Sequence, residues 1–313
     1  MGLSYFKNNI SYLGGEKLKS KESFKGLYEK IRDRGITFNY HSSEDVIKIL
    51  SERNYYYRLI SYRKNFYKTD GKYRGLDFMA LYDMSSIDTY LRSYLFDLCL
   101  DIEHISKTNL MTHLTKNNSE DGYTILDEFK DEFPYLYNKA MSHFSGNKYK
   151  KEMYRKRKNE VSVWVFLEII EFGTLNRFIE FYISKYPDFN KVINHSDLQF
   201  IKNIRNSCAH NDVYFINFFN DKDKIERPRQ RTVSLGKEIK IGRNSIQYHK
   251  IHDLVVLFSV HKKNCSLELN QRRFKEGKIV MERVKKNIQL YDDSLDYHSG
   301  FFSINKCIDH LNK

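Results

Sequence analysis

The chain has few residues that interrupt helices. Its 313 residues include only 3 prolines and 14 glycines, and so few breakers over this length favour long helices. The four cysteines (Cys99, Cys208, Cys265 and Cys307) are far apart and form no C-x-x-C pair. This spacing argues against a structural zinc or a redox pair, and reduced thiols are the simplest interpretation.

Several chemical signatures are also absent. The sequence contains no phosphate-binding loop, no G-x-G-x-x-G fingerprint and no H-E-x-x-H motif. His249 and His252 are too close for the usual i,i+4 zinc pair. No apolar run approaches about 18 residues, and the first residues lack an apolar core of signal-peptide length. We therefore expect no cofactor, no metal and no membrane partner, and a soluble cytoplasmic protein.

What the chain does have is apolar content and positive charge. Hydrophobic residues make up 41% and aromatic residues 15%, which is enough for a globular core. The formal net charge is +13 and the pI is about 9.3. Such a surplus suits a polyanionic partner or a membrane surface. The alternative is the background of a lysine-rich proteome.

Hydrophobic periodicity predicts helices through most of the chain. Residues 1–20 are expected to be poorly ordered, and a helix is expected at about 22–34. Ser42 and Asp45 form a capping-box pattern, so a helix should start near Ser43. The clearest helix carries apolar residues at steps of three or four: Met84, Ile87, Leu91, Leu95, Leu98, Ile102 and Ile105.

The second half is predicted to be helical with one exception. Residues 161–183 are strongly apolar and indicate a helix pair or one long helix, with Gly173 marking a break or a close approach. A Ser-Asp cap should open a helix at 196, which buries Ile201, Ile204 and Cys208. At about 230–248, apolar residues alternate with polar ones around two glycines, which predicts a small β-hairpin.

The expected fold is therefore mainly α with a small β-hairpin insertion. We expect one helical domain over residues 21–265, which contains the hairpin, and a basic C-terminal helical extension over residues 266–313.

The stretch "IRNSCAHN" at 204–211 contains the strongest chemical candidates. His210 has a side chain that titrates near neutral pH and serves as an acid or a base. Arg205 offers a permanent bidentate clamp for phosphate oxygens. On a straight helix, five residues turn by about 140° and rise about 7.5 Å, so the two side chains would not share a face. Either the helix ends near Ala209, or two copies of the motif meet across a dimer. The structural alternative is a buried helix whose arginine pairs with a carboxylate and whose histidine caps its end.

Four ordered blocks resemble the bacterial abortive-infection (Abi) family. They cover roughly residues 25–265. The matching residues are Tyr57-Arg58-Leu59 and Tyr62; Leu81-Tyr82, Leu91-Arg92, Glu103 and Lys107; Trp164, Glu168 or Glu171, and Phe172-Gly173-Thr174; then Arg205-Asn206, Cys208-Ala209-His210 and Asn217.

The resemblance implies membership of the HEPN superfamily. Its members are helical, often dimeric, and many cut RNA without a metal through an R-x4-6-H motif. By resemblance, Arg205 and His210 are catalytic and Asn206 supports them. RNA is then the expected partner, both as target and as a small regulatory or guide RNA, and a homodimer is expected. The chain departs from the family after the motif, where Asn211-Asp212-Val213-Tyr214 replaces a commoner second histidine and arginine.

Further residues are candidates for supporting roles. Glu103 and Lys107 form either an ordinary i,i+4 ion pair or a pair that lines the site opposite the Arg205 helix. The run 148–158 has seven basic residues and two tyrosines, and is either an RNA track or a solvated loop. The predicted RNA-binding residues are Lys148, Lys150, Lys151, Arg155, Lys156, Arg157, Lys158, Arg58, Arg63, Arg229, Arg231 and Arg243.

The sequence thus favours a metal-independent endoribonuclease of the HEPN type in bacterial anti-phage defence, a toxin held in check until infection. The alternative is a non-catalytic RNA-binding protein on the same scaffold, which forms a ribonucleoprotein with a small structured RNA.

Overall fold

A computed structural model describes residues 12–13, 16–17 and 21–312 of the chain. The prediction of poor order over residues 1–20 lies largely outside these residues. The described part is mainly helical, as expected, and has two short antiparallel hairpins. The α-helices are α1 (Phe24–Asp33), α2 (Ser43–Lys48), α3 (Tyr56–Ser61), α4 (Phe78–Lys116), α5 (Thr124–Glu132), α6 (Pro134–Gly146), α7 (Lys151–Arg157), α8 (Val163–Ile169), α9 (Phe172–Lys185), α10 (His195–Ala209), α11 (Gln230–Ile239), α12 (Arg243–Ile246), α13 (His249–Asn264), α14 (Leu267–Lys285) and α15 (Leu295–His310).

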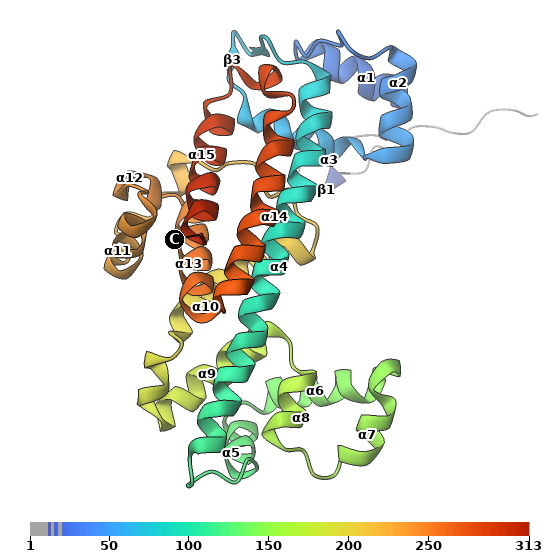
Figure 1. Ribbon diagram of the computed structural model, residues 1–313. Helices are drawn as coiled ribbons and strands as arrows, with labels where there is room; N and C mark the ends of the chain where they lie inside the picture. The colour runs from blue at the N-terminus through green and yellow to red at the C-terminus, as the bar shows by residue number, and fades with distance from the viewer. Residues whose placement is uncertain (1–11, 14–15, 18–20, 313) are drawn as a thin grey trace, which may run out of the picture.

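Helix α4 is the axis of the molecule (Figure 1). Its 39 residues span about 58 Å at 1.5 Å per residue. Helices α10, α13 and α14 pack along it, and α15 packs on α13 and α14. Helices α1–α3 lie beside its N-terminal half, and α5–α9 surround its C-terminal end (Figure 1). The predicted stripe is buried along this axis from Met84 to Ile102, and its last residue, Ile105, is half-buried. The helix that is clearest in the sequence is therefore confirmed.

Local signals explain where most helices begin. Ser42 caps α2 with the predicted capping box, in which Ser42 and Asp45 each accept a backbone hydrogen bond from the other. Asn194, rather than the expected Ser196, caps α10 and accepts from the Ser196 amide. The apolar segment after 161 forms a helix pair, α8 and α9, which separates at Ile170 and Glu171. Gly173 lies inside the first turn of α9 rather than at the break.

The prediction places the β-hairpin at the wrong position, because the segment at about 230–248 is helical. Residues Gln230–Ile239 form α11 and Arg243–Ile246 form α12. Gly236 is required by close packing, because a Cβ there would lie 2.2 Å from Ile246 Cδ1. The small hairpins are instead β1–β2 (Tyr12–Leu13, Glu16–Lys17) and β3–β4 (Lys68–Thr69, Lys72–Tyr73).

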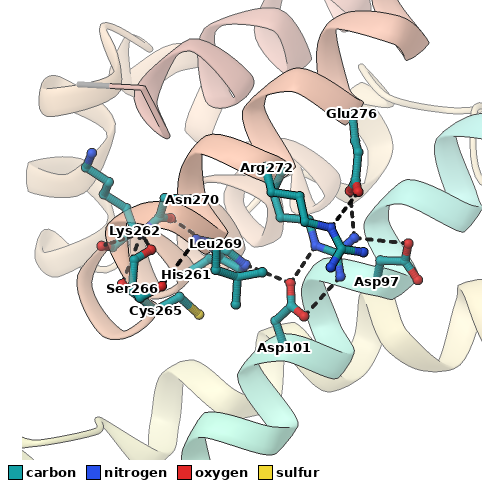
Figure 2. Close-up of polar contacts among 11 residues, drawn as sticks. Asp97, Asp101, His261, Lys262, Cys265, Ser266, Leu269, Asn270, Arg272 and Glu276 are labelled. Atoms are coloured by element: carbon teal, nitrogen blue, oxygen red, sulfur yellow. Dashed lines mark hydrogen bonds and ion pairs between the residues drawn. The ribbon is translucent and has the colours of Figure 1, made fainter.

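A polar cluster joins α4 to the two helices that pack against it from the C-terminal part of the chain (Figure 2). Asp101 of α4 accepts two hydrogen bonds from Arg273 of α14, at 2.6 and 3.0 Å. Its Oδ2 also lies 3.0 Å from Nε2 of the fully buried His261 of α13. Nδ1 of His261 in turn contacts Asn270, at 2.9 Å. The polar groups of this cluster therefore satisfy one another, as buried polar groups require.

No helix in the described part of the chain combines the length and the apolar character needed to cross a bilayer.

Candidate functional site

Helix α10 ends at Ala209 in a Schellman motif. His210 is the C-cap residue and Asn211 follows with a positive φ of 59°. The Asn211 amide donates to the Cys208 carbonyl at 3.1 Å, and the Asp212 amide donates to the Ser207 carbonyl at 2.9 Å. Asparagine is one of the few residues that enter the left-handed region readily. Asn211 therefore stops the helix directly after the Arg/His motif.

The spacing of Arg205 and His210 predicted either a helix end near Ala209 or a dimer, and the structure shows the helix end. Arg205 lies in the last turns of α10, whereas His210 is the C-cap residue, whose amide donates to the Asn206 carbonyl at 2.9 Å and whose side chain is exposed to solvent. Within the described residues, no group forms a hydrogen bond with the His210 ring. The imidazole is thus available to a ligand at the end of the helix.

Arg205 is half-buried and only loosely engaged. Its guanidinium lies over the Phe96 ring of α4, 5.8 Å from the centroid. Nη1 reaches Asn206 Oδ1 at 3.5 Å, and the buried Nε has no hydrogen-bond partner in the part of the chain described. Lys139 lowers the pKa of the nearby Glu171 through a hydrogen bond, and the charge of Arg205 acts in the same direction. Arg205 therefore keeps donor capacity that the fold does not use.

Two arginines from other helices hold Asn211. Arg58 of α3 donates to its backbone carbonyl, and Arg92 of α4 donates to its side-chain Oδ1. Both arginines are buried. They fix the residue that ends α10, and with it the position of His210.

Arg58 and Arg92 together form a clamp on Asn211, and Asp88 of α4 supports this clamp. It is fully buried and accepts from Arg92 Nε at 3.1 Å and from the Tyr62 hydroxyl at 2.9 Å. It also accepts from the backbone amides of Phe215 at 2.7 Å and Tyr214 at 3.3 Å. Burial, together with the neighbouring Asp88, raises the pKa of Tyr62 well above its ordinary value. One carboxylate thus joins α3, α4 and the segment after the motif.

Lys250 of α13 holds the same segment from the opposite side. Its ammonium donates to the carbonyls of Tyr214 at 2.5 Å and Ile216 at 2.6 Å. Burial lowers the pKa of Lys250 to about 8, although Asp88 and Asp212 oppose the shift. The chain that follows His210 is therefore held both by the buried Asp88 and by the half-buried Lys250.

Comparison with known proteins identifies the family. Residues 48–215 match the family described as Abi-like protein, which is more than half of the chain. The chain belongs to the Abi-like family. No curated protein and no solved structure matches it. The matched region runs from α2 to the segment after His210, and so contains the motif, Asp88 and both clamping arginines.

Sequence reasoning missed the clamp of this Abi-like chain. The sequence patterns assign no role to Asp88 or Asn211, and Arg92 enters only as part of a family-like block. A signal was present, because Asp88 and Arg92 form an i,i+4 charged pair inside a long helix that is otherwise buried largely through apolar residues. Arg58, predicted to bind RNA, is 8% exposed and donates to the Asn211 carbonyl, and its contact with RNA stays a prediction.

Glu103 and Lys107 form the i,i+4 ion pair, at 3.1 Å. Two turns of α4 separate Glu103 from Phe96, so the pair lies on the helix face that Arg205 contacts. Lys107 also lines a hollow of about 490 Å³ with Trp164 and Glu168. The ordinary ion pair, the first interpretation, is confirmed, and a role of the pair in lining the site stays a prediction.

The basic run forms a 3-10 turn (Lys148–Lys150) and α7. Lys150 donates to the Glu168 carbonyl, and Lys156 pairs with Glu152 at 2.7 Å. Tyr149 is fully exposed. The remaining cations of the run are exposed and form no ion pair with the described residues: Lys148, Lys151, Arg155, Arg157 and Lys158.

The other predicted RNA-binding arginines have mixed environments. Arg229 and Arg231 pair with the buried Asp197 at 3.1 and 2.9 Å, and so bind α11 to the start of α10. Arg63 donates to the Ile60 carbonyl at 2.6 Å. Arg243 is exposed. Of these four arginines, Arg243 alone has a guanidinium that forms no hydrogen bond or ion pair with the described residues.

Two histidines, His249 and His252, lie near the start of α13, and the buried one, His252, contacts neighbouring side chains. Nε2 of His252 lies 3.0 Å from the Thr232 hydroxyl and Nδ1 lies 3.0 Å from Asp253. Over residues 12–13, 16–17 and 21–312, no group of three or more His, Cys, Asp or Glu side chains is arranged to hold a metal ion.

Proposed function

We propose that this Abi-like protein acts in abortive infection as a metal-independent endoribonuclease of the HEPN type. Family membership supports the role in abortive infection. The nuclease assignment rests on one observation. A Schellman end, held by buried arginines, presents an exposed His210 directly after the helix that carries Arg205.

The chemistry requires little beyond these two side chains. A base removes the proton of a ribose 2′-hydroxyl, and the 2′-oxygen forms a bond to phosphorus. The bond from phosphorus to the 5′-oxygen breaks, and an acid returns a proton to that oxygen. His210 supplies one of these proton transfers, since histidine titrates near neutral pH. Arg205 stabilises the charge on the phosphate oxygens with its unused donors.

One histidine cannot serve as base and acid in the same step. A second copy of the chain supplies another His210 if the two α10 ends meet across a two-fold axis. We therefore include a homodimer in the proposal. The preparation used for activity is expected to have twice the chain mass of 37.6 kDa by light scattering.

The test is cleavage of a labelled RNA in EDTA by wild type, His210→Ala and Arg205→Ala. His249→Ala replaces another exposed histidine, outside the motif, and is the matched control. We expect both motif variants to lose at least about a hundredfold in rate, the scale of a lost acid–base group or charge clamp. The control should keep full rate. Products should carry a 2′,3′-cyclic phosphate and a 5′-hydroxyl.

Equal rates for wild type and His210→Ala, with contaminating nucleases excluded, overturn the nuclease assignment. Stable copurification of one small structured RNA, without turnover of any RNA supplied, identifies a non-catalytic RNA-binding protein instead. The exposed basic run on α7 fits either outcome.

A further inference from the structure

A cleft of about 970 Å³ opens beside the end of α10. Its walls come from the π-helical turn Ile49–Arg53 and the start of α3, from the first turns of α4, and from the C-terminal end of α14. Asn211, the neighbour of His210, lines it. The cleft therefore lies next to the residue that follows the motif.

The charge of the cleft is predominantly positive. Its lining includes five cations and two carboxylates: Arg53, Arg58, Arg92, Arg283 and Lys286 against Glu52 and Asp83. Asp83 is already used, because it accepts from Arg283 at 2.6 Å, Asn287 at 2.7 Å and Tyr291 at 2.7 Å. Asp88 behind the wall balances part of the charge on Arg58 and Arg92. The lining still has a net positive charge when Glu52, Asp83 and Asp88 are all counted against the five cations.

Two guanidinium groups in the wall have an unsatisfied nitrogen. Arg58 is more than nine-tenths buried, and its Nη2 lies 3.7 Å from Asp88, too far for a hydrogen bond. Nη1 of Arg283 is buried and also lacks a partner among the described residues. A buried donor without an acceptor costs about 1–3 kcal/mol. Both nitrogens lie beneath the surface of the cleft, so they leave uncompensated positive charge in its wall.

Aromatic side chains stand at the same cleft. Tyr55 and Tyr90 are exposed, and the Tyr82 hydroxyl accepts from Arg53 at 3.1 Å. Exposed tyrosine rings next to arginines and lysines are the combination that binds unpaired bases and their phosphates. The volume exceeds what one phosphate needs and accommodates a short length of strand.

We infer that this cleft binds a single-stranded segment of RNA, with the exposed Arg53 and Lys286 on its phosphates, the buried Arg58 and the half-buried Arg283 adding positive charge behind them, and Tyr55 and Tyr90 on its bases. The segment passes Asn211 and leads to His210. The inference deepens the proposed function and rests on it. It assigns the substrate as an unpaired strand and assigns its path.

The test measures binding apart from cleavage. A fluorescent single-stranded RNA 12-mer is titrated into His210→Ala protein at several salt concentrations. The test variant adds Arg53→Glu and Lys286→Glu, two exposed cleft residues. The matched control adds Lys48→Glu and Lys285→Glu, which are exposed neighbours outside the cleft with the same charge change. Tyr90→Ala is compared with Tyr57→Ala, an exposed tyrosine that does not line the cleft.

We expect the cleft variant to bind at least about tenfold more weakly than its control. The slope of log K against log salt should fall by about 0.7 for each phosphate that the protein no longer neutralises. Tyr90→Ala should weaken binding more than Tyr57→Ala.

Equal binding by the cleft and control variants overturns the inference, even if His210→Ala confirms the nuclease. If AMP competes as strongly as unlabelled 12-mer, the cleft is a mononucleotide site and the strand assignment is wrong. Weaker binding by the cleft variant, together with no cleavage by wild type, supports the cleft and defeats only the nuclease proposal.

Discussion

Asn211 connects the backbone of the motif to its supporting charges. It occupies the left-handed region that ends α10, and both its carbonyl and its side chain accept from buried arginines. Alanine there would lose the side-chain hydrogen bond and adopt positive φ at a cost of about 1–2 kcal/mol. Glycine would adopt the same backbone freely and lose only the hydrogen bond from Arg92.

We therefore predict that Asn211→Ala lowers the free energy of unfolding by about 2 kcal/mol and Asn211→Gly by less. RNA cleavage should fall in both, because His210 is no longer held. Urea unfolding and single-turnover cleavage measure the two effects. Asn217→Ala is the control, since Asn217 also has positive φ, at 55°, but lies outside the clamp. A loss of cleavage no greater than in Asn217→Ala would show that Asn211 does not position the histidine.

The sequence singles out Arg205 and His210 but not the residues that place them. Arg58 and Asp88 are separated from residues 211–215 by more than 120 positions, and no local pattern reports contacts at that distance. A buried arginine and an exposed one also look alike in a sequence. The charge of Arg58 alone predicts RNA binding, and only the fold shows that its guanidinium holds a helix end.

Helices and turns differ in how far sequence predicts them. The long stripe of α4 repeats its period over many turns, so its helix is well specified. The segment 230–248 is short, and its apolar residues fit both the helical period of about 3.6 residues and the strand period of about 2 residues. Its buried residues, Thr232, Val233, Gly236 and Ile239, follow helical spacing. The β3–β4 hairpin had the stronger signal, because Asp70-Gly71 both take positive φ, the type I′ turn that an Asp-Gly pair favours.

At the junction of α4, α13 and α14, the carboxyl group of Asp101 forms a contact whose strength depends on pH (Figure 2). Burial alone would raise the pKa of Asp101, but hydrogen bonds from His261 and Arg273 lower it to about 2. An unfolded aspartate titrates near about 3.9. Because the folded pKa is lower, this contact stabilises the fold fully above about pH 4, and the stabilisation disappears as the pH falls toward 2.

We expect this contact to contribute up to about 2 kcal/mol at pH 6 through its pKa difference. Asp101→Asn should be less stable than wild type at pH 6, and the difference should narrow between pH 4 and pH 3. Chemical denaturation at each pH provides the measurement. Asp97→Asn removes a more exposed carboxylate from the same arginine and is the control. A gap that stays constant over this range would show that Asp101 does not titrate as described.

One hydrophobic cluster extends through the described chain, and the C-terminal helices contribute to it. Gly277 of α14 shows how closely they pack, because a Cβ there would lie 2.7 Å from the Tyr94 hydroxyl of α4 and 2.8 Å from Ile308 of α15. The predicted division of the chain at residue 265 falls between α13 and α14, two elements that both contact α4. Residues 266–313 also supply Arg283 and Lys286 to the cleft of about 970 Å³ that we propose to bind RNA.

A chain ending at residue 265 is therefore expected not to fold by itself. The removed segment contributes ten buried apolar side chains: Val280, Met281, Val284, Tyr291, Tyr297, Phe301, Ile304, Cys307, Ile308 and Leu311. Without this segment, the surfaces of α4 and α13 that α14 and α15 cover are exposed to water, which opposes folding of the remaining chain. Circular dichroism during urea titration should show no cooperative transition for residues 1–265. Coexpression with residues 266–313 as a separate chain should restore the transition. If residues 1–265 unfold cooperatively on their own, the C-terminal helices are an extension on an independent domain, and the cleft is formed only when that extension docks.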